Sequence, residues 1–366
     1  MNSFVHPQAL ENRLKVLTAL SRENLLSKNE LAAATGLSLA DMSYHVRYLE
    51  ESELIEAGPS EVLPASPGRP GSRFRLRNNA FEVLITQIDL PLVRLSRSRS
   101  DGSSEVVLEK NLSVKTQAEL LNALRTLIAG ALEPQTDGLK KNDNTWLFLS
   151  FAGVSDRAVL SSVDGIDAWR PYHLGPHFSK LLGIPVRILS AVSTLALGYS
   201  ASQKGKDALV IALKAREKIF RYAEILNGKI RFGERGSSGA IGHFKVRGFD
   251  GACYCGARGC LEMFLGSKES FSKKMSALES AVESGQREAG LSARGDRVMT
   301  ARGWEFSQGK IQNWRFLSRE EESDLVGLGA RLIALEEVHR DILLNLHPAS
   351  QLDEAKKKRK KSGRVV

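Results

Sequence analysis

The hydrophobic and polar positions of the first eighty residues predict three short helices in quick succession. Residues 8–21 place leucines on one face at helical spacing, at Leu10, Leu14, Leu17 and Leu20. Residues 27–30 (Ser-Lys-Asn-Glu) form a capping-box pattern that opens a second helix, which we expect to stop at Gly36. Residues 38–41 (Ser-Leu-Ala-Asp) repeat the pattern and open a third helix to about Ser52. Two capped helices joined by a short turn predict a helix-turn-helix.

A β-hairpin wing is predicted after the third helix. Residues 54–58 and 72–77 have strand-like patterns, and the second of these alternates arginine with apolar residues. The loop between them is rich in proline and glycine, and its Arg69 would enter the narrow minor groove of DNA, where the negative potential is strongest. The alternative is a flexible turn with a solvated arginine. Arg73 and Arg75 would contact phosphates or else simply flank the strand.

The third predicted helix has the composition of a DNA-recognition helix. We expect Met42, Val46 and Leu49 on its buried face. Small and hydrogen-bonding side chains on the other face would let the backbone approach the base edges. Together with the wing, the candidate DNA contacts are Ser38, Ala40, Ser43, Tyr44, Arg47, Arg69, Arg73 and Arg75. Among them, Tyr44 and Arg47 would read bases. The alternative is a winged helix that docks a protein, because residues 1–80 carry equal numbers of basic and acidic residues, nine of each.

From about residue 81 the pattern changes to an α/β layout. Strand-like apolar runs at 145–151 and 208–213 alternate with helical stretches, and residues 325–339 have a long helical pattern. The polar segment 266–318 predicts only mixed helix and loop. These patterns divide the chain into a winged helix-turn-helix (1–80), a large domain (81–350) and a basic tail (351–366) that we expect to be disordered.

The charge of the chain is concentrated in its tail. The formal net charge is +10, but residues 356–366 carry seven basic residues and no acid, which leaves +3 for the rest. Global charge is therefore weak support for nucleic-acid binding. No apolar run of about 18 residues predicts a membrane span, and no signal-peptide pattern opens the chain. Clustered cysteines favour a metal in the reducing cytoplasm over disulfides.

All three cysteines lie within eight residues, at Cys253, Cys255 and Cys260, and His243 lies just upstream. Three thiolates and one imidazole match a closed tetrahedral Zn²⁺ site, and glycines at positions 256 and 259 permit the tight loop that a metal requires. The alternative is three small buried hydrophobic residues near a turn. We predict a structural zinc ion, because four protein ligands leave no open position for water.

The segment around the cysteines resembles a family signature. Residues 236–243 (Gly-Ser-Ser-Gly-Ala-Ile-Gly-His) and residues 253–262 (Cys-x-Cys-Gly-x-x-Gly-Cys-Leu-Glu) are similar to the motifs of the ROK family of repressors, open reading frames and sugar kinases. A winged helix-turn-helix ahead of such a domain is the arrangement of the family's transcriptional repressors. The resemblance implies a two-lobed, actin-like ATPase fold of the ribonuclease H-like type, with a sugar cleft between the lobes.

Three requirements of that family's kinase chemistry are missing from this chain. Residues 183–186 (Gly-Ile-Pro-Val) lead in the family to an Asn-Asp pair whose Asp is the catalytic base, but this chain has Ser190 and Ala191. Alanine cannot accept a proton. The two phosphate loops, expected near residues 83–100 and 214–221, contain no glycine to let backbone N–H groups close on phosphate. We therefore expect no catalytic residue and no bound ATP.

The sugar site that the resemblance implies is also reduced. The family's Glu-x-Gly-His becomes Ala240-Ile-Gly-His243, so one carboxylate that would hold sugar hydroxyls is missing. His243 and Glu262 stand at matching positions and are the possible ligand-binding residues for an effector, a sugar or sugar derivative. The alternative is a vestigial cleft kept for packing, or one reshaped for another ligand.

These observations predict a cytoplasmic, kinase-inactive transcriptional regulator of the ROK type, acting as a repressor. Its partners would be a double-stranded DNA operator and a second copy of itself, as a homodimer or higher homo-oligomer, because one recognition helix reads only a half-site. The competing hypotheses are a sugar kinase that uses displaced catalytic residues and a protein-interaction module.

Overall fold

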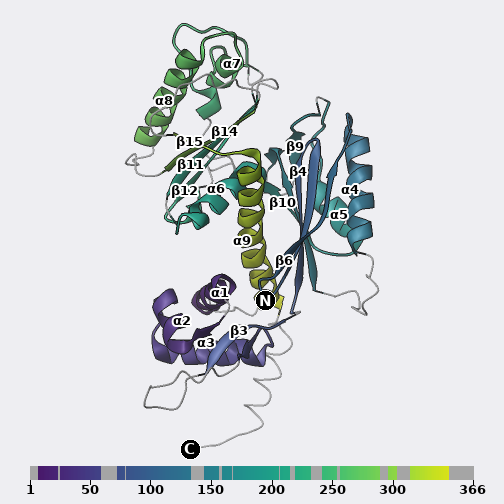
Figure 1. Ribbon diagram of the computed structural model, residues 1–366, viewed down its shortest axis with the longest axis vertical. Coiled ribbons are helices and arrows are strands. Elements are labelled where there is room, and N and C mark those ends of the chain that lie inside the picture. Colours follow the sequence, from purple (N-terminus) through teal and green to yellow (C-terminus); the bar gives the residue numbers. More distant parts are fainter. Residues whose placement is uncertain are drawn as a thin grey trace, which may run out of the picture.

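The first part of the chain folds as a winged helix in the computed structural model (Figure 1). The structure describes residues 7–23, 25–58, 72–78, 80–132, 144–155, 159–166, 168–205, 207–214, 219–231, 241–253, 256–288, 296–302 and 314–345. Its winged helix contains α1 (Pro7–Arg22), β1 (Leu26–Ser27), α2 (Lys28–Thr35), α3 (Leu39–Glu51), β2 (Ile55–Ala57) and β3 (Arg73–Leu76). The predicted helices and wing strands are confirmed.

Caps and a glycine set the helix boundaries of this domain. The Ser27 hydroxyl accepts from the Glu30 N–H and the Glu30 carboxylate accepts from the Ser27 N–H, which confirms the predicted capping box. That backbone hydrogen bond is the main cause that lowers the pKa of Glu30. Gly36, with φ of 71°, ends α2. Ser38 caps α3, but the Asp41 carboxylate accepts from the Ser38 hydroxyl (2.7 Å), a different pairing from the predicted box.

The hydrophobic core of the winged helix includes a residue from the far end of the chain. β3 pairs antiparallel with β1 and β2, and this sheet covers a core built mainly from α1 and α3. Met42, Val46 and Leu49 are fully buried there, as predicted. Leu343, near the end of α9 (Arg319–Asn345), is 1% exposed in the same core. The winged helix is therefore packed onto α9 by apolar contact, in addition to its chain connection to the first lobe.

Two five-stranded sheets with one shared strand order form the two lobes of the large domain. The first contains β4 (Glu82–Asp89), β5 (Leu92–Arg99), β6 (Ser104–Asn111), β7 (Thr145–Phe151) and β10 (Val186–Ser190). The second contains β11 (Ala208–Lys214), β12 (Ile219–Leu226), β13 (Lys229–Ile230), β14 (Asp296–Arg302) and β15 (Trp314–Phe316). In each sheet the first three strands form an antiparallel meander, the fourth pairs in parallel with the first, and the fifth pairs in parallel with the fourth.

The predicted strands at 145–151 and 208–213 are confirmed by β7 and β11. The prediction of mixed helix and loop over 266–318 was right about a helix, at residues 271–288, but it missed the two strands β14 and β15 in the same segment. β14 pairs in parallel along the whole of β11, so its hydrogen bonds come from a strand more than eighty residues away. Such a strand is defined by its neighbours, and its polar flanking sequence gives little local signal.

Helices cover both sheets and fill the space between them. α4 (Gln117–Leu132) and α5 (Leu174–Leu182) pack on one face of the first sheet, and α9 packs on the other. α6 (Ala191–Ser202) packs on the second sheet, so α6 and α9 lie side by side between the lobes (Figure 1). The remaining elements are β8 (Gly153–Ser155), β9 (Leu160–Val163), the 3-10 helix η1 (Ile241–His243), α7 (Leu261–Leu265) and α8 (Phe271–Glu288). No helix among the residues that the structure describes combines the length and apolar composition needed to cross a bilayer.

Candidate functional sites

The outer face of α3 presents most of the predicted DNA contacts to solvent. Ser38, Ala40, Ser43, Tyr44 and Arg47 are all exposed. Tyr44 is 53% exposed although its ring stacks edge-on against buried His45. Burial is the main cause that lowers the pKa of His45, and nearby Arg13 adds to it. The structure thus brings these side chains onto one surface, while the Ser38 hydroxyl already bonds within its own cap.

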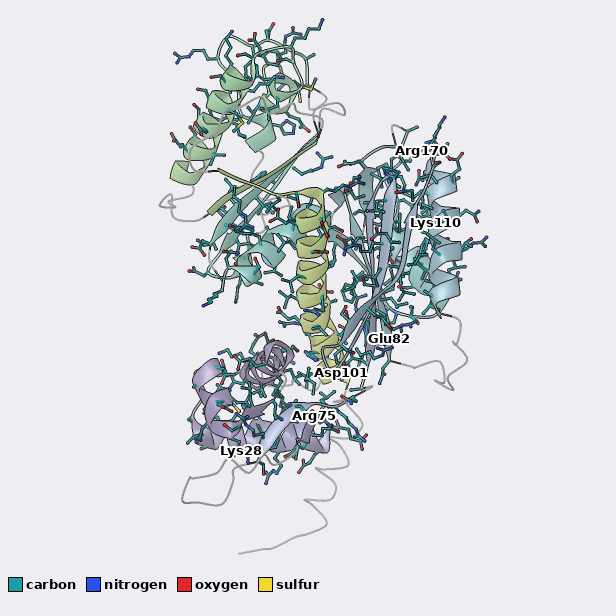
Figure 2. All side chains as sticks on the ribbon, in the orientation of Figure 1. Lys28, Arg75, Glu82, Asp101, Lys110 and Arg170 are labelled. Atoms are coloured by element: carbon teal, nitrogen blue, oxygen red, sulfur yellow. The ribbon has the colours of Figure 1, made fainter. Side chains whose placement is uncertain are left out.

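The wing arginines are held by ion pairs within the domain. The Arg73 guanidinium lies 2.6 Å from the Glu30 carboxylate, and Arg75 lies 2.6 Å from Glu56 on the paired strand. Figure 2 shows Arg75 with Lys28 in the winged helix, whereas Glu82 marks the start of the first lobe. Contact with phosphate would therefore have to compete with these carboxylates. Arg69 lies outside the described residues.

Leu39 is a candidate contact that the sequence reasoning missed. It is the first residue of α3 and is 54% exposed, on the same face as Ala40 and Tyr44. Residues in the first turn of a recognition helix contact base edges, and an apolar side chain there suits the thymine methyl group. Its place next to the predicted cap was the signal that could have identified it.

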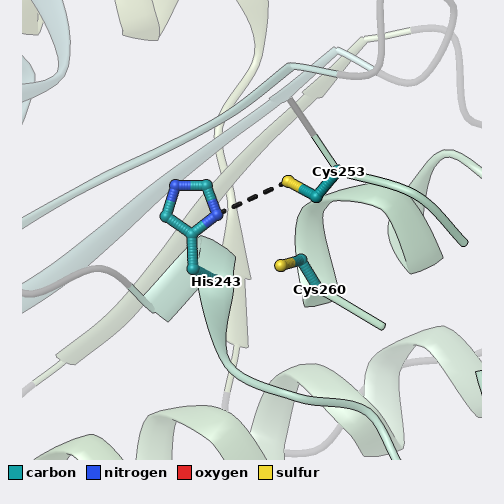
Figure 3. A group of neighbouring side chains, drawn as sticks. All are labelled: His243, Cys253 and Cys260. Carbon is teal, nitrogen blue, oxygen red and sulfur yellow. Dashed lines mark hydrogen bonds between the residues drawn. The ribbon is translucent and has the colours of Figure 1, made fainter. Parts of the chain in front are cut away.

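His243, Cys253 and Cys260 come together at one corner of the second lobe, between the end of η1 and the start of α7 (Figure 3). Their donor atoms all lie within 4.8 Å of one another, and the Cys253 Sγ is 3.7 Å from the His243 Nδ1. Two ligands of a tetrahedral Zn²⁺ ion are expected about 3.6 Å apart, given Zn–N and Zn–S distances of about 2.0 and 2.3 Å. Both thiols are buried. The fourth predicted ligand, Cys255, lies outside the described residues.

Local backbone geometry explains how this corner folds. Gly256 and Gly259 have φ of 87° and 83°, values that side chains other than glycine rarely adopt. A Cβ at Gly259 would also overlap the Phe249 carbonyl oxygen closely. The loop then delivers Cys260 to the cap position of α7, with His243 at the end of η1. The donor set and its spacing therefore fit a metal ion, and the structure brings together three of the four residues that the sequence pattern predicted as ligands.

A pocket opens between the two lobes. Its walls come from the ends of β4 and β7, the first turns of α6 and α9, and strand β12; the polar residues among them include Gln87, Asp89, Arg94, Ser150, Asp164, Arg221, Arg319, Glu322 and Ser323. Ala191, the position of the family's expected catalytic base, lines this pocket at the start of α6. No carboxylate is available at that position.

Arg221 lines this pocket and pairs with two buried carboxylates. Its guanidinium lies 3.3 Å from the Asp164 carboxylate in the first lobe and 3.6 Å from the Glu262 carboxylate on α7. Asp164 and Glu262 are 4% and 6% exposed, and Arg221 is 20% exposed. Glu262, one of the two predicted ligand-binding residues, thus already bonds an arginine. The sequence reasoning recognised no role for Arg221 or Asp164.

The first of the two phosphate-loop positions is built differently from a phosphate cradle. β4 and β5 join at Leu90 and Pro91, with no glycine in the turn. The second expected loop joins β11 to β12, and residues 215–218 of it lie outside the described chain, as does Ala240. Arg94 on β5, which lines the pocket, bonds the carboxylates of Glu109 (2.6 Å) and Asp324 (3.1 Å). These hydrogen bonds raise the pKa of Arg94 against the opposing effect of its burial.

Comparisons with known proteins agree with this architecture. The family model for winged helix-turn-helix DNA-binding domains matches residues 10–56. The chain is 23% identical to the DNA-binding transcriptional repressor Mlc of Escherichia coli (strain K12), over 67% of this chain and 59% of the relative. It is 21% identical to a putative xylose repressor of Caldicellulosiruptor sp. (strain Rt8B.4), over 74% of this chain and 68% of that protein.

A solved structure has the same overall fold. The crystal structure of a ROK family transcriptional regulator, a homologue of the E. coli Mlc protein, matches with a TM-score of 0.60 and 16% identity, over 93% of this chain and 98% of that one. The ROK family model matches residues 101–298, which is more than half of the chain. The protein therefore belongs to the ROK family, with a winged helix-turn-helix ahead of a two-lobed ROK domain.

Proposed function

We propose that the protein is a DNA-binding transcriptional repressor of the ROK type that has no kinase activity. The exposed face of α3, which carries Tyr44 and Arg47 within a winged helix, is the observation that carries this proposal. The names of two similar proteins support it, because one is a DNA-binding transcriptional repressor and the other a putative xylose repressor.

In this function α3 lies in the major groove. Arg47 hydrogen-bonds a base, Tyr44 and Leu39 pack against base edges, and Arg69 enters the adjacent minor groove. Arg73 and Arg75 exchange their carboxylate partners for phosphates or stay in their ion pairs. Two copies bind together as a homodimer or higher homo-oligomer, since a single recognition helix reads only half a site. The winged helix-turn-helix domain ends near residue 80, and residues 351–366 form a basic tail after the ROK domain.

We further propose that His243, Cys253, Cys255 and Cys260 hold a structural zinc ion. A bound Zn²⁺ supplies a cross-link between η1, the glycine-containing turn and α7. Buried thiols and an imidazole at ligand spacing support this assignment. Because α7 also carries Glu262, this corner positions one wall of the cleft. Thiolate ligands of this kind persist in the reducing cytoplasm, where we place the protein.

The cleft binds no ATP. Any small molecule that it does bind acts as an effector. Ala191 supplies no base, and Arg221 pairs with the carboxylate that would otherwise hold a sugar hydroxyl. A sugar or sugar derivative near His243 and Glu262 would have to displace this arginine.

Selection of duplexes from a random library by the purified, zinc-loaded full chain tests the function. We expect enrichment of a pair of half-sites related by two-fold symmetry, with affinity that falls steeply as salt rises. The matched control is the chain with both Tyr44→Ala and Arg47→Ala, which should enrich nothing. No enrichment by the unaltered chain, together with sugar-dependent consumption of ATP, would instead establish the kinase hypothesis.

A further inference from the structure

The end of α9 places the residues that follow it beside the winged helix. Leu343 of α9 is 1% exposed in the winged-helix core, and Ile342 packs against the same core. The Arg340 guanidinium lies 3.1 Å from the carboxylate of Glu11 on α1. Figure 1 shows α9 running from the lobes to the winged helix, which lies at one end of the molecule. The chain therefore leaves α9 next to the domain that carries α3, although the large domain separates the two in sequence.

A strongly basic segment follows α9 after a short stretch of chain. Residues 356–366 contain five lysines, two arginines and no acid. Residues 346–366 lie outside the described chain, and their number alone sets how far they extend. The stretch from Asn345 to Lys356 covers at most about 35–40 Å, whereas a helix with its side chains is about 10–12 Å across. The basic residues are therefore within reach of a duplex that lies against α3.

The winged helix by itself offers little positive charge to DNA. Residues 1–80 carry nine basic and nine acidic residues, so their formal charges cancel. Three arginines on and just after β3 each pair with a carboxylate of the same domain: Arg73 with Glu30 (2.6 Å), Arg75 with Glu56 (2.6 Å) and Arg77 with Glu53 (3.1 Å). An arginine that leaves a carboxylate for a phosphate exchanges one ion pair for another, so its net gain is small. Affinity for a duplex depends largely on phosphates neutralised by lysine and arginine, so a basic segment beside this domain supplies what the domain lacks.

A run of lysines suits the phosphate backbone better than the bases. The lysine ammonium is a compact, strongly hydrated charge on a long stem, without the planar fork that lets arginine bind the edge of a guanine. Such charges neutralise phosphates and release counterions, but they do not distinguish one sequence from another. Sequence preference and salt-dependent affinity would then come from two parts of the chain, the first from α3 and the second from residues 356–361.

We propose that residues 356–361 bind phosphates of the same duplex that α3 reads, and that they supply a large share of the salt-dependent affinity. This inference deepens the proposed function and rests on it. The burial of Leu343 in the winged-helix core carries it, because that contact fixes where the basic segment begins. An anionic membrane is another polyanion that a lysine run fits, but a segment that begins beside the winged helix favours DNA.

The first test measures how duplex affinity depends on salt. The segment variant is the full, zinc-loaded chain with five changes, Lys356→Gln, Lys357→Gln, Lys358→Gln, Lys360→Gln and Lys361→Gln. We expect the slope of log affinity against log salt concentration to become shallower by about 3–4, because each lost phosphate contact removes about 0.9. In about 0.1 M salt, affinity should fall at least tenfold for the selected duplex and for a scrambled duplex alike.

A matched variant removes the same charge from the two lobes. It changes five exposed lysines to glutamine, namely Lys110, Lys115, Lys180, Lys229 and Lys268. Figure 2 shows Lys110 on the first lobe, away from the winged helix. We expect this variant to keep the salt slope within about 1 of the unaltered chain. An equal loss of slope in both variants would mean that net charge, and not the place of the segment, is responsible, and would overturn the proposal.

The two duplexes together separate this proposal from the proposed function. If the unaltered chain binds both duplexes equally and the segment variant loses slope, the segment binds DNA and the operator-reading function fails. If the selected duplex is preferred and the segment variant keeps the full slope, the function stands and this proposal fails. Lysine-dependent binding to phosphatidylserine vesicles, with no change of slope on DNA, would assign the segment to membranes and also overturn the proposal.

Chemical protection of the lysines gives a direct measure of where the duplex lies. An activated acetate ester modifies exposed lysines, and mass spectrometry compares their rates in the full chain with and without the selected duplex. We expect the five segment lysines to react about tenfold more slowly when the duplex is bound, while Lys110 and Lys268 keep their rates. Equal rates at the segment in both states would refute the proposal.

Discussion

Polar side chains on the outer face of α3 stand in solvent, whereas Arg221 of the cleft is paired with two buried carboxylates. Tyr44 is 53% exposed, and Arg47 is 72% exposed with only a distant Glu51 carboxylate at 3.9 Å. In the cleft, Asp164 and Glu262 are almost fully buried on either side of Arg221. The two regions belong to one chain and use the same kinds of charged residue.

This difference indicates which surface is free to accept a large polyanion and which is already satisfied by its own partners. A charged group in solvent can exchange water for a new partner at little cost. A buried charge can leave its partner only if something equally complementary replaces it. The face of α3 is therefore suited to bind, and the cleft is stabilised as it stands. The predictions below test each side of this contrast.

Loss of the proposed zinc site should have the largest effect on the stability of the lobe that carries Arg221 and Glu262. Cys260→Ser replaces a fully buried thiol at the N-cap position of α7, the helix of Glu262. We expect bound zinc to fall below detection and the second lobe to lose roughly 5 kcal/mol or more of stability. Metal analysis and thermal melting measure both. His173→Asn, an exposed histidine elsewhere in the chain, is the control that should keep the metal. A Cys260→Ser chain with full zinc content would contradict the assignment.

Removal of the cleft arginine tests whether the cleft is internally satisfied. Arg221→Met leaves the buried carboxylates of Asp164 and Glu262 without this cation, and we expect a loss of about 3–5 kcal/mol in denaturant unfolding. Arg258→Met is the matched control, because its ion pair with Asp250 lies in the same lobe but is exposed on both sides. Equal midpoints for the two variants would show that the buried ion pairs do not stabilise the cleft.

A buried histidine between the two regions predicts a specific response to acid. Burial lowers the pKa of His339 to about 3, and neither ring nitrogen has a hydrogen-bond partner among the described residues. The unfolded chain binds this proton near pH 6.5, so stability is full above that pH and falls as the pH decreases toward 3. We expect His339→Leu to resist acid better than the natural chain by about 2–3 kcal/mol at pH 4.5.

Unfolding curves at pH 7.5 and pH 4.5 measure this effect, and His177→Leu, an exposed histidine, serves as the control. The advantage of His339→Leu over the natural chain should grow as the pH is lowered. An advantage of the same size at both pH values would mean that the ring's packing, and not its protonation, is responsible.

Local sequence patterns predicted the winged helix and the cysteine loop better than they predicted the cleft. Caps at Ser27 and Ser38 and the spacing of Cys253 and Cys260 depend on residues a few positions apart, so their geometry follows from the sequence. The Arg221–Asp164 pair joins residues 57 positions apart on different lobes. A local sequence pattern cannot predict such an ion pair, because its two residues come together only after both sheets have formed.

The same reasoning explains why α9 was predicted as a helix but not as a connector. Its apolar spacing over 325–339 indicated the helix. The burial of Leu343 in the winged-helix core depends on where the first lobe ends, and the need for glycine at Gly329 depends on the Thr194 carbonyl oxygen of another helix, which a Cβ would overlap. Each residue is ordinary in sequence and becomes informative only when its neighbour in space is known.

The smallest expected effect concerns a single contact on the exposed side. If Arg47 reads a base, Arg47→Ala should weaken binding to the selected duplex by about 1–3 kcal/mol and relax sequence preference at one position, while the dependence on salt stays the same. If it contacts phosphate instead, affinity should fall equally for all sequences and the salt slope should decrease by about 1. Arg125→Ala removes the same charge from the exposed surface of α4 and should change neither quantity. Unchanged affinity, preference and salt slope for Arg47→Ala would remove Arg47 from the reading surface and leave that role to Tyr44 and Leu39.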